Sequence, residues 1–265
     1  MMDILSEIAQ HTKERVGKRI SMLGRQRLEE LARQKGANDG FPFESALRTE
    51  EMAFICEIKR ASPSKGIIAE DFAYLDIAKE YEAAGAAAIS VLTEPYWFKG
   101  DDLYLREIAG TVSLPLLRKD FIIDSYMIFE AKVLGANAVL LICSLLDSYT
   151  LGEYISIAHG LGMSALVEAH DENELDMALK AGTRIIGVNN RDLKTFEVDT
   201  SLSIRLMKML PDDIVFVSES GIRTAEDVAM LRKNGVDAVL VGETLMRAPD
   251  KAAALRGLRG EVGGL

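Results

Sequence analysis

The sequence predicts an α/β protein with the fold of a (β/α)8 TIM barrel and an N-terminal helical extension. Eight apolar, strand-like runs alternate with amphipathic segments of helix length. Five of those runs end abruptly in charged or amide side chains. In parallel α/β folds the carboxyl ends of the strands meet on one rim, where such folds keep their chemistry. The sequence therefore predicts an enzyme whose site lies on that rim.

The first element is helical and spans residues 3–35. Its apolar residues recur at intervals of three to five, which is typical of an amphipathic helix. The segment GANDGFP (36–42) then breaks the pattern. We interpret residues 1–47 as a helical extension and residues 48–265 as a single barrel domain.

A repeat of amphipathic helix, glycine and β-rich run begins near residue 52. Four copies show it most clearly: AAGAAAISVL (83–92), VLGANAVLLI (133–142), KAGTRIIGVN (180–189) and KNGVDAVLVG (233–242). Glycine suits the left-handed position just past a helix. The Val, Ile and Leu residues that follow suit a strand buried on both faces.

All the strand-like runs together predict the barrel. They cover residues 53–58, 87–92, 114–118, 138–142, 164–168, 184–188, 214–218 and 238–242. Asp124, Asp171 and Thr224 are candidate caps for the helices that follow three of them. The alternative is a doubly wound open sheet, but the first strand is followed by KRASPSKG rather than by G-x-G-x-x-G.

Composition excludes several classes of protein. Hydrophobic residues make up 48% and charged residues 27% of the chain, as in ordinary globular proteins. No apolar run is long enough to span a membrane, and the N-terminus has no signal-peptide core, so we expect a cytoplasmic protein. The net charge of −10 argues against nucleic acid as a partner. Cys56 and Cys143 lie in apolar runs and read as core residues, and three scattered histidines predict no metal site.

The polar residues that end the strands share one face of their strands. Each stands above an apolar residue of the same parity, as Glu168 does above Leu166. The predicted polar layer consists of Glu57, Lys59, Lys119, Glu168, Asn189, Arg191 and Glu219. Partial burial among mixed charges shifts the pKa values of these groups, so that some can act as acids and others as bases. General acid–base catalysis requires this difference. The alternative is a structural network of ion pairs.

A phosphate site is predicted beside this layer. The loops after the seventh and eighth strands read SESGIRT (218–224) and VGETLMRA (241–248), where many barrels bind phosphate. Backbone N–H groups at Ser220–Gly221 and Gly242–Glu243 are the candidate donors, although the Glu243 side chain must then point away. Ser62, in the loop after the first strand, is a further candidate.

Tyr96, Trp97 and Phe98 follow the second strand. They could line an apolar pocket on the rim or fasten the loop to the barrel, and the sequence leaves both interpretations open.

Seven motifs together resemble the indole-3-glycerol phosphate synthase family over nearly the whole chain. They are CEIKRASPSKG, VLTE…FKG, LRKDFIID, LVEAH, GVNNRDL, VSESGI and LVGETLM, in this order and spacing, after the helical ILSEIAQHTKERVGKR. The resemblance implies a barrel with its extension packed over the rim and no metal or organic cofactor. It implies ring closure of 1-(2-carboxyphenylamino)-1-deoxyribulose 5-phosphate to indole-3-glycerol phosphate, CO2 and water, in tryptophan biosynthesis.

The resemblance also implies a role for each site residue. Lys119 would protonate the ketone oxygen of the substrate, Glu168 would act as the base, and Lys59 would be a second acid. Glu57 would orient the lysines, with Asn189 and Glu219 positioning hydroxyls and the anilino nitrogen, and Arg191 as a supporting charge. Phe98 would line the pocket for the aromatic ring. The phosphate would lie on Ser62, Ser220, Gly221, Gly242 and Glu243.

Two other functions stay open at this point. A phosphosugar lyase or Schiff-base aldolase commonly has a reactive lysine at the end of the sixth strand, where this chain has Asn189. A non-catalytic barrel could bind a phosphorylated ligand, although it would not need two lysines and three carboxylates on one rim. The chain ends soon after the eighth unit, so we expect no fused isomerase domain. The mixed outer helix faces are compatible with a monomer and with an oligomer.

Overall fold

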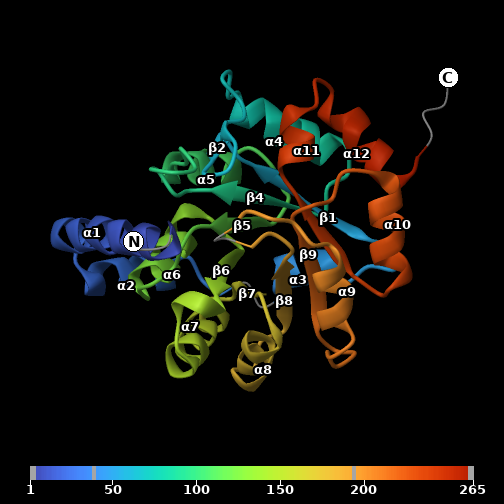
Figure 1. The fold of residues 1–265 in the computed structure, drawn as a ribbon. Helices are drawn as coiled ribbons and strands as arrows, with labels where there is room; N and C mark the ends of the chain where they lie inside the picture. Colours follow the sequence, from blue (N-terminus) through green and yellow to red (C-terminus); the bar gives the residue numbers. More distant parts are fainter. Residues whose placement is uncertain (1–3, 38–39, 193–194, 262–265) are drawn as a thin grey trace.

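Eight parallel strands close into a barrel in the computed structural model, which describes residues 4–37, 40–192 and 195–261 (Figure 1). The strands are β1 (Ala53–Ile58), β4 (Ala88–Leu92), β5 (Leu116–Lys119), β6 (Ala138–Ile142), β7 (Ser164–Ala169), β8 (Ile185–Asn189), β9 (Val215–Glu219) and β10 (Ala238–Val241). β1 pairs with both β4 and β10, which completes the ring. The predicted (β/α)8 TIM barrel is therefore confirmed, and the open sheet is excluded.

Helices surround the barrel and alternate with its strands (Figure 1). They are α4 (Tyr74–Ala83), α5 (Asp102–Ala109), α6 (Tyr126–Leu134), α7 (Ser148–Gly160), α8 (Glu172–Lys180), α9 (Ser201–Met207), α10 (Ala225–Lys233) and α12 (Lys251–Arg259). Shorter elements are the hairpin β2 (Ala61–Ser62) and β3 (Gly66–Ile67), the 3-10 turn η1 (Cys143–Leu145) and α11 (Glu243–Arg247). Among the described residues, no helix has the length and apolarity that crossing a membrane requires.

The glycines and helix caps that were predicted at the helix ends of the repeat are largely confirmed. The glycines at 85, 135, 182 and 235 have φ angles of 78°, 98°, 79° and 87°, in the left-handed region where side chains are disfavoured. Asp171 and Thr224 cap α8 and α10. Asp124 is not the cap of α6, because Ser125 occupies that position. Asp124 instead accepts the backbone N–H of Tyr126 and pairs with Arg25.

The barrel interior is packed with apolar side chains of the predicted parity. Ile55, Leu117 and Leu166 are buried there together with residues from all the remaining barrel strands. Outward-facing strand residues form a second, larger core with the surrounding helices. Cys56 and Cys143 are free thiols in that outer core, as predicted. The two cores orient each strand, and the orientation determines which terminal side chains face the rim.

Three helices precede the barrel: α1 (Ile4–Leu23), α2 (Arg25–Gln34) and α3 (Pro42–Leu47). The single helical segment expected over 3–35 is divided at Gly24, whose φ is 77°. The first turns of α1 lie over the rim, and α2 packs on α6. α3 lies at the opposite end, where it contacts β1 and β4 and places Phe43 in the interior core. Only part of segment 1–47 thus covers the rim, and the domain boundary at residue 47 stays a prediction.

Candidate active site

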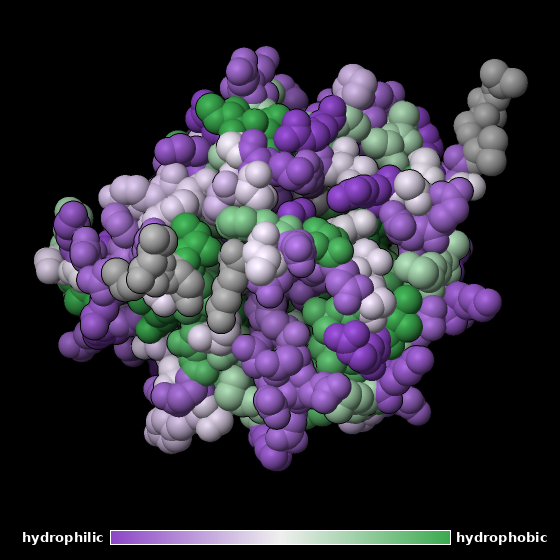
Figure 2. Space-filling view, in the orientation of Figure 1, coloured by the Kyte–Doolittle hydropathy of each residue, from purple (hydrophilic) through white to green (hydrophobic). Residues whose placement is uncertain are grey.

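A cavity of about 530 Å³ lies over the carboxyl ends of the strands. Its lining includes every predicted site residue: Glu57, Lys59, Ser62, Phe98, Lys119, Glu168, Asn189, Arg191, Glu219, Ser220, Gly221, Gly242 and Glu243. Figure 2 shows this face of the molecule, where hydrophilic residues gather over the barrel with hydrophobic groups beside them. The structure therefore brings together residues that are up to 186 positions apart, from Glu57 to Glu243.

Lys119 lines the cavity between two carboxylates. Its Nζ donates a hydrogen bond to Glu219, and it lies 3.4 Å from Oε2 of Glu168. Burial alone would lower the pKa of Lys119, but the carboxylates of Glu219, Glu168 and Glu57 raise it above its usual range. Lys119 is therefore an ammonium ion throughout the neutral range, and it can supply positive charge and a proton.

The two carboxylates beside Lys119 have pKa values that are shifted in opposite directions. Burial raises the pKa of Glu219, and the charges of Glu168 and Glu57 add to that effect. Burial also acts on Glu168, but Lys119 and His170 outweigh it and lower the pKa of this carboxyl. Environments that shift the pKa values of two carboxyl groups apart in this way give the two groups different roles. Glu168 is ionised at neutral pH, and Glu219 protonates more readily.

Glu57 and Lys59 form a second ion pair on the same floor. The Nζ atom of Lys59 lies 2.5 Å from Oε1 of Glu57. Gly242, on the neighbouring strand end, leaves room for this pair. A Cβ atom at Gly242 would lie 2.3 Å from Oε1 of Glu57 and 3.1 Å from Nζ of Lys59.

Gly187 makes comparable room for Glu219, and we expect Gly187→Ala to lower kcat by about 100-fold. An added Cβ would lie 2.3 Å from Oε1 of Glu219 and 3.2 Å from Cδ1 of Leu166. Glu219 would then move away from Lys119, and a displacement of about 1 Å in a site costs about 10²-fold in rate. Steady-state kinetics on the purified variant check this.

The matched control is Gly257→Ala, because the Cβ that it adds to α12 meets nothing within 4 Å apart from the adjacent residues and the backbone of its own helix. We expect that variant to keep the wild-type rate. Equal rates for Gly187→Ala and the wild-type protein would contradict the packing argument.

The end of the cavity near β9 and β10 combines a turned backbone with several cations. Ser220 and Gly221 have φ angles of 66° and 82°, and Asn190 holds the turn by donating to the Ser220 carbonyl at 3.0 Å. The basic side chains that line this end are Lys59, Lys65, Arg191, Arg223 and Arg247. These cations and the backbone N–H groups of the turn suit a phosphate group.

The Glu243 side chain points toward this group of cations. Its carboxylate lies 3.2 Å from Nε of Arg247, 3.8 Å from Nζ of Lys65 and 3.9 Å from Nη2 of Arg191. The expectation that this side chain points away from the phosphate site is therefore wrong, and the carboxylate balances part of the positive charge at this end.

An apolar wall faces the polar floor. Phe98 packs on Phe121 with ring centroids 5.9 Å apart, and Ile4, Leu5 and Ile8 of α1 also line the cavity. Tyr96 and Trp97 do not line it. They contact the ring of His11 on α1, at 4.8 Å and 5.1 Å between centroids. The two interpretations of this loop thus apply to different residues: Phe98 faces the pocket, and its neighbours fasten the loop to α1.

Sequence reasoning missed the groups that hold this wall. The buried carboxylate of Glu94 accepts the backbone N–H groups of Tyr96, Trp97 and Phe98 at 2.7–3.0 Å. Asp120, next to Lys119, accepts a hydrogen bond of 2.7 Å from Arg15 of α1. The acidic residue after a strand end was a visible signal for Asp120, but its partner comes from the distant N-terminal helix.

No metal site is formed by the described part of the chain, where no three His, Cys, Asp or Glu side chains are grouped to hold an ion. The site is instead an array of lysines and carboxylates with a basic end and an apolar wall. Such an array can protonate a carbonyl oxygen, accept a proton and bind a phosphorylated aromatic compound.

Comparison with known proteins identifies the relatives of the chain. A family model described as indole-3-glycerol phosphate synthase matches residues 5–258. The protein named indole-3-glycerol phosphate synthase from Ruminiclostridium cellulolyticum is 59% identical to this chain, over 98% of this chain and 100% of the relative. The protein of the same name from Endomicrobium trichonymphae is 52% identical, over 97% of this chain and 99% of the relative.

Solved structures support the fold alone. A 3-hexulose-6-phosphate synthase matches with a TM-score of 0.62 at 15% identity, over 80% of this chain and 100% of that chain. KGPDC from Streptococcus mutans matches with a TM-score of 0.61 at 12% identity, over 80% and 97%. Identities this low carry no statement about the reaction.

Proposed function

The chain belongs to the indole-3-glycerol phosphate synthase family, and from that premise we propose that its rim cavity performs the reaction of the family. The reaction is ring closure of 1-(2-carboxyphenylamino)-1-deoxyribulose 5-phosphate with loss of CO2 and water, which makes the protein a carboxy-lyase of tryptophan biosynthesis. One observation supports this most directly. Lys119 is kept as an ammonium ion between Glu168 and Glu219, on the floor of a cavity with a basic end and an apolar wall.

The proposed first step uses Lys119. The aryl carbon that bears the carboxylate attacks the ketone carbon, and Lys119 donates a proton to the ketone oxygen. An ammonium group placed where negative charge develops stabilises that transition state. Loss of CO2 then returns the electron pair to the ring and restores its aromaticity.

The remaining steps remove one water molecule. The new hydroxyl leaves as water after it takes a proton from an acid, for which Lys59 is placed. Glu168 accepts the proton that the ring system loses, and the indole forms. Glu57 orients Lys59 through their 2.5 Å contact. Asn189 and Glu219 line the floor beside the substrate hydroxyls, with Arg191 as a further charge.

The substrate has three chemical parts, and the cavity offers a matching surface to each. We place the phosphate on Ser62 and on the backbone of Ser220, Gly221, Gly242 and Glu243. The aromatic ring packs against Phe98 and the apolar residues beside it. The reacting ketone then lies over the lysines and carboxylates. We further propose that the enzyme works in the cytoplasm on this small molecule.

The deciding experiment is an indole-fluorescence assay with the carboxyphenylamino substrate. We expect the folded protein to form indole-3-glycerol phosphate without added metal or cofactor. Folded protein that gives no turnover would rule out the proposal. Borohydride added during turnover tests the aldolase alternative, and we expect it to trap no stable adduct because no lysine stands at the end of β8.

A further inference from the structure

His170 lies directly behind the proposed base, between two carboxylates. Its Nδ1 is 3.1 Å from Oε2 of Glu174, and its Nε2 is 3.3 Å from Oε1 of Glu168. The ring nitrogens therefore face one acid from α8 and one from β7. Nε2 is buried, and it makes no well-aligned hydrogen bond within the described part of the chain. Because both nitrogens face acceptors, the imidazole is suited to carry two protons.

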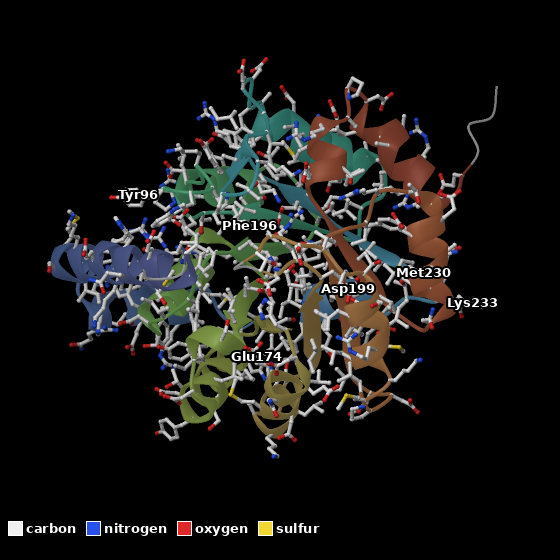
Figure 3. All side chains as sticks on the ribbon, in the orientation of Figure 1. Tyr96, Glu174, Phe196, Asp199, Met230 and Lys233 are labelled. Carbon is white, nitrogen blue, oxygen red and sulfur yellow. The ribbon has the colours of Figure 1, made fainter. Side chains whose placement is uncertain are left out.

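The start of α8 determines where this histidine lies. Asp171 caps the helix by accepting the N–H of Glu174 at 2.9 Å. Oε2 of Glu174 in turn accepts the backbone N–H of His170 at 2.8 Å, besides contacting its ring. The ring is thus held from both its backbone and its side chain. Figure 3 labels Glu174 on α8.

The carboxylate of Glu168 is consequently divided between two cations. Oε1 faces His170, and Oε2 faces Lys119 at 3.4 Å. A carboxylate with a partner on each oxygen cannot rotate without losing one of them. The geometry resembles other sites in which a residue behind the catalytic group fixes its orientation.

We propose that His170 is a positioning residue of this reaction: as an imidazolium ion it fixes the Glu168 carboxylate in its ionised form, with Oε2 presented to Lys119 and the substrate. His170 lines no part of the cavity, so it acts through Glu168 and not on the substrate. The inference deepens the proposed function and rests on it.

The charges around His170 favour this state. The titratable groups that interact with His170 or Glu168 are Lys119 of β5, Cys143 of η1, Glu174 of α8 and Glu219 of β9. Glu57 of β1 acts on Lys119 and Glu219, and Asp171 acts on Cys143. Burial lowers the pKa of His170, but Glu168 and Glu174 outweigh it and raise the pKa to about 10. His170 therefore stays charged at neutral pH.

The test begins with the charge itself. The ¹⁵N chemical shifts of the His170 ring are measured from pH 6 to pH 9 in the protein labelled at histidine, with the signal assigned by its absence from His170→Gln. We expect an imidazolium ion across the neutral range, and a neutral ring at pH 7 would overturn the proposal. This measurement needs no substrate, so it stands even if the protein gives no turnover.

The kinetic arm uses His170→Gln, which is neutral and polar. Because the imidazolium lowers the pKa of Glu168, its removal raises that pKa, and the rate falls first at low pH. We expect the acid limb of the kcat–pH profile to move up by about one pH unit, since a nearby opposite charge shifts a carboxyl by about 1–3 units. KM at pH 8 stays within about twofold of the wild-type value.

A second variant and a control separate this effect from loss of structure. Glu174→Gln keeps the charged His170 but removes the carboxylate that anchors its ring, so the imidazolium ion holds Glu168 less firmly, and we expect a smaller shift in the same direction. His159→Gln, on α7 and against Phe41, leaves the profile unchanged. A loss of rate that is equal at every pH, or an acid limb that moves in neither site variant, would overturn the proposal.

Discussion

Replacing Lys119 by methionine is expected to lower kcat by about 10²–10⁴-fold, the range that a positioned acid contributes. Methionine has a similar length but carries neither charge nor proton. The ketone oxygen would then develop negative charge over Glu168 and Glu219, without the ammonium ion that contacts both of them. The indole-fluorescence assay at saturating substrate measures the loss.

A matched control for Lys119→Met is Lys180→Met. Lys180 is exposed on α8 and makes a surface ion pair with Asp176, and such pairs contribute little. We expect the wild-type kcat from that variant. If Lys119→Met kept the wild-type rate while remaining folded, Lys119 could not be the acid that protonates the substrate.

The barrel and the floor of its site could be predicted because they follow from local patterns. Strand parity alone places Glu168 above Leu166, and the structure finds Leu166 in the interior core and Glu168 in the cavity. The glycine that follows each of four helices marks where the chain turns into the next strand. Eight such units fit a closed ring, which brings the strand ends together.

The supporting contacts could not be predicted, because each joins residues that the sequence separates. Arg118 has the opposite parity to Lys119, and no role was predicted for it. In the structure its buried guanidinium lies 2.8 Å from both Asp102 and Glu130. Arg19 of α1 contacts the same two acids. Periodicity does not show which acidic residues of two outer helices approach Arg118. Nor does it show that the distant N-terminal helix supplies Arg19 as a second arginine for the same acids.

Local polar contacts were missed for a different reason. Glu94 looks like an ordinary acid in a loop, and its three N–H partners lie only two to four residues further along the chain. The sequence does not show that this loop folds back onto its own carboxylate. His170 was considered only with the other histidines, for which no metal site was predicted, and its contact with Glu168 depends on the cap at Asp171 that starts α8.

Glu168→Gln is expected to lower kcat by about 10²–10⁴-fold while leaving the early steps of the reaction largely intact. In the free enzyme Lys119 and His170 hold the pKa of Glu168 below its usual value, which makes it a weak base. When Lys119 gives its proton to the substrate, its charge disappears and the pKa of Glu168 rises. The carboxylate becomes a competent base only after ring closure has begun.

This order of events predicts which step fails in the glutamine variant. The amide has the same shape but accepts no proton, so intermediates that have lost CO2 should accumulate. In a single turnover with carboxyl-labelled substrate, we expect labelled CO2 to be released at least tenfold faster than indole fluorescence appears. The exposed Glu172→Gln on α8 should show both signals together, as in the wild-type protein. Equal slowing of CO2 release and indole formation in Glu168→Gln would place Glu168 in ring closure instead, because a base needed only for the final proton cannot delay the loss of CO2.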